Sequence, residues 1–254
     1  MGQFPNLKNA PSVEAVLELR VRLSAPFSAE MAAKFGERMK SAFPKSADLR
    51  FVAATVSFGD EAGVAPSSTV SQIGVRLESE DGKSVVQAKA DGLALSRLAP
   101  YQSWESLIAQ LQGVWPAYVD TFAPQVVTRI GVRFINKIIL GTGPVDLDDL
   151  LVAGPKIPNG LPQSFIQFSS NVVVPMSDQR AAVSISQASE IVPSGPGMGF
   201  NVILDIDAFS EEPHDTNDSG VWNRLEDLRT IKNMAFFGSI KPETLARFQS
   251  LLSL

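Results

Sequence analysis

Three cations recur along one stretch of the chain, TRIGVRFINKIIL, at residues 128–140. Read as a β-strand, the stretch places apolar side chains on one face and Arg129, Arg133 and Lys137 on the other. Arginine pairs with carboxylates and phosphates through two parallel hydrogen bonds, so Arg129 and Arg133 are candidates for binding an anionic ligand. The full candidate ligand-binding set is Arg129, Arg133, Glu14, Glu18 and Asn136.

The first predicted strand, residues 13–23 with the sequence VEAVLELRVRL, offers a structural explanation for these cations. Glu14 and Glu18 fall on its polar face. If the two strands lie side by side, the glutamates face the same side as the cations, and each cross-strand pair of opposite charges contributes roughly 0.2–1 kcal/mol. An ion-pair ladder is therefore the favoured interpretation, and the anion site is the alternative.

A long acidic stretch is the second feature that could carry chemistry. Residues 181–223 contain no Lys or Arg, and Asp205 and Asp207 alternate to one face of a predicted strand, where they could serve acid–base chemistry or hold a metal. Further on, Asp215, Asn217 and Glu226 occupy positions 1, 3 and 12 of an EF-hand-like loop, which would take Ca²⁺ or Mg²⁺. The competing interpretation is a solvated loop in which Asp218 or Ser219 caps the next helix, and no cofactor at all.

Several catalytic classes are excluded by composition. The chain has no Cys and one His, so disulfides, thiolate chemistry and sites with two imidazoles are ruled out. His214 lies in a hydrophilic loop and is expected to be exposed. No Gly-x-Ser-x-Gly elbow is present. The sequence therefore favours a protein that is not an enzyme.

The charge balance and the hydropathy limit which classes of partner the protein can bind. The net charge is −5 and the pI about 5.0, which argues against nucleic acid, because non-specific affinity for it depends on Lys and Arg neutralising phosphates. No window reaches the ~18–20 apolar residues of a membrane span, and the start MGQFPNLKNAP lacks the features of a secretion signal. We expect a cytoplasmic protein without membrane contact.

The elements that would position these residues are mostly strands. After the first strand, Ser28 caps a predicted helix that ends before Pro44. A meander follows, with hairpin turns at Asp81-Gly82 and Asp91-Gly92, and then a helix over 103–122 that Pro116 should kink or split. The second half predicts the strand at 128–140, a short helical segment VDLDDLLV at 145–152, three more strands, and helices over 219–236 and near residue 242.

This order suggests an internal duplication. Both halves run strand, helix, antiparallel strands, helix, and Trp104-x-x-Leu107 is echoed by Trp222-x-x-Leu225. We predict an α+β fold of two tandem units, residues 1–125 and 126–254, that share one continuous structure with helices packed on one face of curved antiparallel sheet. The order of elements looks like that of the TATA-binding-protein-like and helix-grip folds.

Four segments together resemble a sporadically distributed prokaryotic family of uncharacterised proteins of about this length. They are Asn9-Ala10-Pro11-x-x-Glu14-Ala15, Pro100-Tyr101-x-x-Trp104-Glu105, Arg129-Ile130-Gly131-x-Arg133-x-x-Asn136 and Leu204-Asp205-Ile206-Asp207. The resemblance spans most of the chain but implies no activity or catalytic residue. The chain departs from the family pattern in its last long helix, where a histidine usually follows the leucine repeat and this sequence has Leu228-Arg-Thr-Ile-Lys-Asn.

The sequence thus predicts a non-enzymatic binding or interaction protein that acts on a protein partner or as a homodimer, through sheet surface and acidic loop. The alternatives are a metal-dependent hydrolase built on Asp205 and Asp207, and an anion-binding module built on Arg129 and Arg133.

Overall fold

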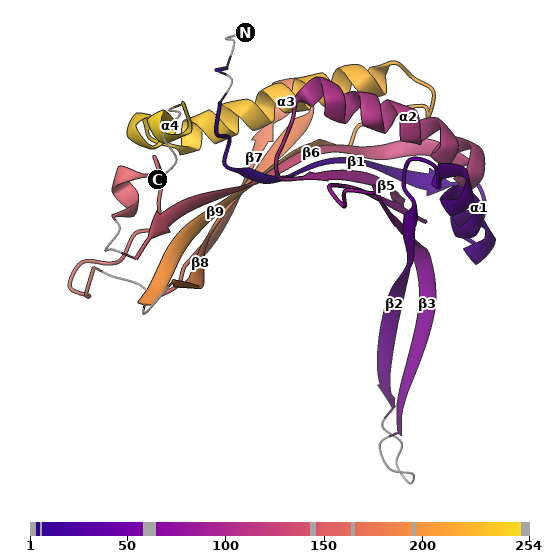
Figure 1. The fold of residues 1–254 in the computed structure, drawn as a ribbon, viewed down its shortest axis with the longest axis horizontal. Coiled ribbons are helices and arrows are strands. Elements are labelled where there is room, and N and C mark those ends of the chain that lie inside the picture. The colour runs from indigo at the N-terminus through magenta and orange to yellow at the C-terminus, as the bar shows by residue number, and fades with distance from the viewer. Residues whose placement is uncertain are drawn as a thin grey trace.

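A computed structural model describes residues 4–5, 7–57, 65–142, 146–163, 166–194 and 197–249. In this part of the chain, nine strands form one antiparallel sheet in the order β2-β3-β4-β5-β1-β6-β9-β8-β7. The sheet is curved and is not closed into a barrel, and the four described α-helices lie on one of its faces (Figure 1). The predicted α+β class and the predicted layering are confirmed.

The nine strands are β1 (Ser12–Leu23), β2 (Lys45–Ser57), β3 (Ala65–Glu78), β4 (Ser84–Lys89), β5 (Gly92–Leu98), β6 (Pro124–Gly141), β7 (Ser169–Met176), β8 (Ala181–Ser194) and β9 (Gly197–Ser210). The four helices are α1 (Ala29–Met39), α2 (Trp104–Phe122), α3 (Gly220–Ser239) and α4 (Pro242–Gln249).

The strands β1 and β6 lie at the centre of the sheet, and they are the two neighbouring strands that are farthest apart in the sequence. They pair antiparallel, with Glu18 opposite Gly131 and Arg20 opposite Arg129. The remaining strands of each half extend outward from this pair, β5 to β2 on one side and β9 to β7 on the other. The side-by-side placement on which the ion-pair ladder depends is therefore present, whereas the division into repeats at residue 125 stays a prediction.

Strand alternation separates the two faces of the sheet. In β1, Ala15, Leu17 and Leu19 are fully buried against the helices, and Ile130 and Val132 of β6 continue the same layer. The polar residues between them point to the opposite face, which the helices do not cover. We call this uncovered side the open face.

Local signals place most of the elements. The Ser28 hydroxyl accepts from the backbone N–H of Met31, and the Ser103 hydroxyl accepts from that of Ser106, so both predicted N-caps are present. Gly82, in the first predicted hairpin turn, has a φ of +67°, which Asp-Gly turns require.

Pro116 does not split α2, which runs without interruption from Trp104 to Phe122. The proline and Gln112, four residues before it, are both exposed. Water can therefore satisfy the Gln112 carbonyl that loses its usual donor, while Trp115 and Tyr118 on either side of the proline are buried in the core.

The helical segment predicted at 145–152 is reduced to a three-residue 3₁₀ turn, Leu147–Asp149, and residue 145 lies outside the described residues. Leu151 instead forms an isolated β-bridge with Ile240. Gly154 and Pro155 follow at once, so the segment has too little chain for a stable α-helix.

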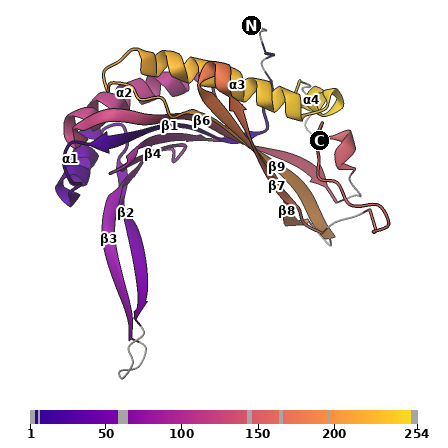
Figure 2. The same ribbon diagram turned by 180° about the vertical axis from the view of Figure 1, so that it is seen from behind.

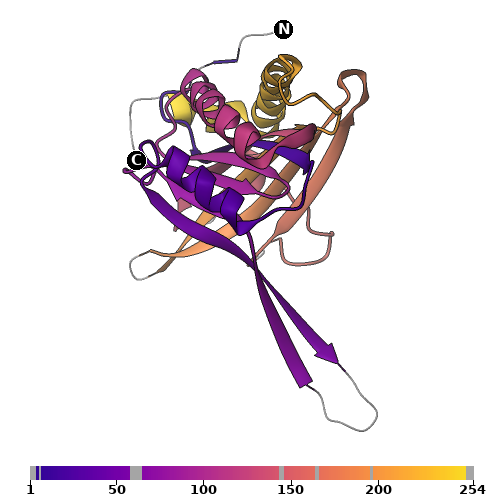
Figure 3. The same ribbon diagram turned by 90° about the vertical axis from the view of Figure 1, so that its right-hand side faces the viewer.

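The β2–β3 hairpin extends well beyond the body of the molecule. Figures 1 and 2 show it projecting on the side of the sheet away from the helices, and Figure 3 shows it separated from the other strands along most of its length. We call the projecting part of this hairpin, residues 51–57 of β2 and 65–71 of β3, the arm.

Candidate functional site

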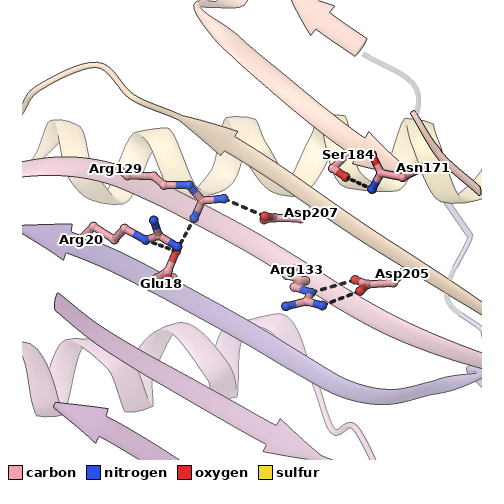
Figure 4. A network of polar contacts seen from close by, with 8 residues as sticks. All are labelled: Glu18, Arg20, Arg129, Arg133, Asn171, Ser184, Asp205 and Asp207. Atoms are coloured by element: carbon pink, nitrogen blue, oxygen red, sulfur yellow. Dashed lines mark hydrogen bonds and ion pairs between the residues drawn. The ribbon is translucent and has the colours of Figure 1, made fainter. Parts of the chain in front are cut away.

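Arg129 is the centre of the charged residues on the open face. Its Nη2 donates to Asp207 Oδ2 at 2.7 Å, and its Nη1 donates to Glu18 Oε2 (Figure 4). The guanidinium also stacks on Phe209, 4.6 Å from the ring centroid. Only 12% of the Arg129 side chain is exposed, so the two ion pairs are largely shielded from water.

Gly131 makes room for this arrangement. A Cβ atom built on Gly131 would lie 2.6 Å from Arg129 Nη1 and 3.5 Å from Asp207 Oδ1. Any larger residue at this position would displace a guanidinium that two carboxylates and a ring hold in place. The glycine in the motif Arg-Ile-Gly-x-Arg therefore positions the first arginine.

Arg133 is paired differently. Its Nε and Nη2 donate to the two carboxylate oxygens of Asp205 at 2.8 and 2.5 Å, and this hydrogen bonding raises the pKa of the guanidinium. The Arg133 side chain is 48% exposed, four times the exposed fraction of Arg129. Figure 4 shows the two pairs as separate interactions along β6.

Most of the carboxylates that pair with these cations come from β8 and β9, whereas the sequence predicted partners on β1. Lys137, the third cation, pairs with Glu190 of β8 at 2.6 Å. Of the two predicted glutamates, Glu18 contacts Arg129 directly, whereas Glu14 acts on Arg133 only as a nearby charge. Asp205 and Asp207, predicted as metal ligands, are instead the partners of the two arginines.

Asp207 is the carboxylate most affected by its surroundings. Burial raises its pKa, and this effect outweighs the lowering by Arg129 and Arg133. Loss of the arginine neighbour would therefore raise the pKa of Asp207 further.

Asn136 lies on the other face of the sheet from the arginines, because it is an odd number of residues away along β6. It is buried, and its Nδ2 donates to the Leu204 carbonyl at 3.0 Å and to the Phe134 carbonyl at 3.2 Å. Its Oδ1 accepts from the Ser12 hydroxyl at 2.8 Å. The structure therefore separates Asn136 from the candidate set in which the sequence argument placed it.

The acidic loop after β9 is anchored by its own hydrogen bonds. Asp218 Oδ1 accepts from the Gly220 backbone N–H at 2.7 Å, which caps α3 and lowers the pKa of that carboxyl. The Thr216 carbonyl accepts from Trp115 Nε1 at 3.0 Å. Asp215 and Asn217, on either side of Thr216 in the chain, are both exposed.

Glu226, the twelfth position of the EF-hand-like spacing, accepts from Trp104 Nε1 of α2 and lies 3.5 Å from Arg229 Nη1. Within the described ranges, no group of three His, Asp or Glu side chains could hold a metal ion. The spacing thus has no matching arrangement of ligands in that part of the chain.

His214 is not the exposed residue that its hydrophilic surroundings suggested. Its backbone N–H and carbonyl both bond to Val127 of β6, which draws the loop against the sheet. The side chain is only 14% exposed, with Nδ1 3.3 Å from Asp218 Oδ2.

A pocket on the helix side of the sheet was missed by the sequence argument. It has a volume of about 820 Å³ and lies between the N-terminal segment, the loop that follows β5 and the C-terminal half of α3. Lys232 of α3 lines it and is a buried residue. The signal was present in the sequence, because Leu225, Leu228, Lys232 and Phe236 fall on one helical stripe on which a lysine is out of place.

Comparisons with known proteins give no family. No family model matches the chain, and no curated protein matches it. Among solved structures, the crystal structure of DynU16, a protein of the dynemicin biosynthetic locus, aligns over 91% of this chain and 97% of that chain at 12% identity and a TM-score of 0.18. A TM-score this low does not indicate a shared fold.

None of the described helices is long and apolar enough to cross a membrane.

Proposed function

We propose that the protein is a non-enzymatic binding protein whose partner is another protein, contacted by the arm and the adjoining open face. The observation that carries this proposal is the exposure of apolar side chains on the arm. Val52 and Val70 lie directly opposite one another in the β2–β3 ladder and are 61% and 55% exposed.

Such an arm gains little stability in water without a partner. A two-stranded ribbon is at best marginally stable without a third strand or a packed face. Among the described strands, β2 pairs only with β3, so in that part of the chain it also presents an unpaired backbone edge, to which another chain can add a strand. Exposed apolar pairs together with a free edge are typical of a surface that a partner protein covers.

The opposite end of the sheet has the same character. β7 is the other edge strand, and its Val172 and Val173 are both more than half exposed. The open face between the two edges carries charges that are paired with one another. A partner that lies across this face would meet a polar surface bordered by two apolar edges.

The alternatives have less support. A hydrolase would need Asp205 and Asp207 free to bind a cation or a proton, and each is paired with an arginine. An anion-binding module would need cations without partners, and Arg129, Arg133 and Lys137 each have a carboxylate.

The arm is tested by the double substitution Val52→Lys and Val70→Lys. Burying two valines contributes about 3 kcal/mol, so the double variant is expected to bind the partner about 100-fold more weakly. Both positions are exposed, so the folded state should change little in stability. The measurement is the amount of partner protein that copurifies with each variant from the native host, together with the mass of each variant by light scattering.

The matched control is the double substitution Val152→Lys and Leu161→Lys. These two apolar residues are 59% and 57% exposed and lie outside the arm. The proposal predicts that a near-stoichiometric protein, or a second copy of the chain, is retained by this control and lost from the arm variant. Equal retention by both variants, or a monomer with no protein bound, would contradict it.

A further inference from the structure

The pocket on the helix side has the size and walls of a small-molecule site. Its volume of about 820 Å³ lies within the range of roughly 300–1,000 Å³ that such sites occupy. Aromatic side chains form much of the lining, and Tyr101 and Phe134 meet edge to face with ring centroids 5.2 Å apart. On the outer side, Phe4 stacks on Phe237 at 5.1 Å.

Lys232 is the polar group set into this wall. The residue is 8% exposed, and Nζ lies over the Phe134 ring, 3.7 Å from the centroid. In the described part of the chain, no carboxylate or hydrogen-bond acceptor pairs with this ammonium group. The nearby charge that affects it, among these residues, is Arg229, one turn earlier on α3, which repels it.

Lys232 differs in this respect from the cations of the open face. Each of the three cations on the open face has a carboxylate within 3 Å. A buried ammonium without such a partner is costly, and a cation–π contact offsets only part of that cost. Burial accordingly lowers the pKa of Lys232 to about 7, so at neutral pH the amine accepts a proton when an anion is supplied.

The charges around the pocket favour an anion. Among the described residues that line it, Lys8, Arg229 and Lys232 are cationic and Glu105 is acidic, an excess of two positive charges in a chain of net charge −5. Arg229 is held at the rim, with its guanidinium 5.0 Å from the Trp104 ring centroid and 3.9 Å from Glu105. Glu105 is thus directed toward Arg229, and Lys232 is left for the ligand.

We propose that this pocket binds a small carboxylate whose remainder is an aromatic ring or a short apolar chain, with the carboxylate paired to Lys232 and the apolar part against Tyr101 and Phe134. A carboxylate supplies the charge that Lys232 lacks, and the ring or chain fills the aromatic wall. The site is independent of the arm, so its failure would leave the proposed protein contact untouched.

The test uses two probes of nearly the same shape, 3-phenylpropionate and its neutral amide, 3-phenylpropanamide, which lacks the negative charge. Binding is measured by titration calorimetry near pH 7. For wild type we expect a Kd of about 1 mM or tighter for the acid, and at least about tenfold weaker binding of the amide. Lys232→Met keeps the length of the side chain and removes its charge. In this variant the preference for the acid should fall below about twofold.

Lys34→Met is the matched control, because Lys34 is exposed on α1 and the substitution changes the net charge equally. It should bind both probes as wild type does. No saturable binding of 3-phenylpropionate to wild type, equal affinity for acid and amide, or an unchanged preference in Lys232→Met would each overturn the proposal.

Discussion

Arg129→Ala is expected to lower the free energy of unfolding by about 3 kcal/mol, because it leaves two shielded carboxylates without their cation. Arg129 is 12% exposed, and Glu18 and Asp207 are 22% and 25% exposed. Removing one member of a buried ion pair costs more than the pair contributes, since the remaining charge keeps its desolvation penalty. The measurement is urea unfolding at neutral pH.

Arg133→Ala on the same strand is the matched comparison. It removes an equally well-formed pair with Asp205 that is 48% exposed on the arginine side, so the expected loss is below about 1 kcal/mol. Equal losses in the two variants would contradict the role of burial.

The effect of Arg129→Ala should also depend on pH. Burial already raises the pKa of Asp207, and loss of Arg129 removes a charge that lowers it. In the variant, Asp207 therefore takes up a proton at a higher pH than in wild type. The stability difference between the two proteins should shrink as the pH falls through the range in which Asp207 takes up a proton in both.

Lys232→Met is expected to stabilise the protein, by up to about 5 kcal/mol at and below neutral pH. Burial lowers the pKa of Lys232 from 10.5 to about 7 in the folded protein. Below about pH 7, both the folded and the unfolded chain hold the proton, and the folded state bears the full cost of the buried charge. Methionine fills a similar volume without that cost.

The sign of the pH dependence follows from the two pKa values. Between pH 7 and 10.5 the unfolded chain keeps a proton that the folded chain has lost, so wild-type stability gains from Lys232 as the pH rises. The advantage of Lys232→Met should therefore shrink across this range and vanish near its upper end. Thermal unfolding of both proteins from pH 6 to about 10 measures it. A variant that is less stable than wild type at neutral pH would contradict the account of Lys232.

Much of the fold follows from local patterns in the sequence. The alternation in β1 and β6 identifies both strands and the face that each one buries, and the Asp-Gly pairs locate the turns of the meander. The serines before α1 and α2 mark the starts of those helices. These features depend on a few neighbouring residues, which is why they can be read without the tertiary structure.

The partners of the charges could be predicted only in part. Glu18 as a partner of Arg129 required a single assumption, that β1 lies beside β6. Pairing Arg133 with Asp205 requires in addition that β9 lies on the other side of β6 in one particular register. A shift of that register by two residues would keep both aspartates on the open face but change their partners, and the alternation of β9 does not distinguish the two registers.

The pocket could not be predicted from the sequence, for a related reason. It is formed by segments around residues 4–12, 99–105 and 229–237, which come together only through the order of strands in the sheet. Lys232 on the apolar stripe of α3 was a usable sign that this helix face has a polar function, but it could not show which segments form the other walls.

The account depends most on the claim that the charges of the open face neutralise one another and are not held for a ligand. A double-mutant cycle of Arg129→Met and Asp207→Asn tests this claim directly, through the free energies of unfolding with and without added phosphate. We predict a coupling of about 1–3 kcal/mol between the two residues that phosphate does not change. The claim would be contradicted by a coupling below about 0.5 kcal/mol, together with phosphate that stabilises the wild type but not the Arg129→Met variant.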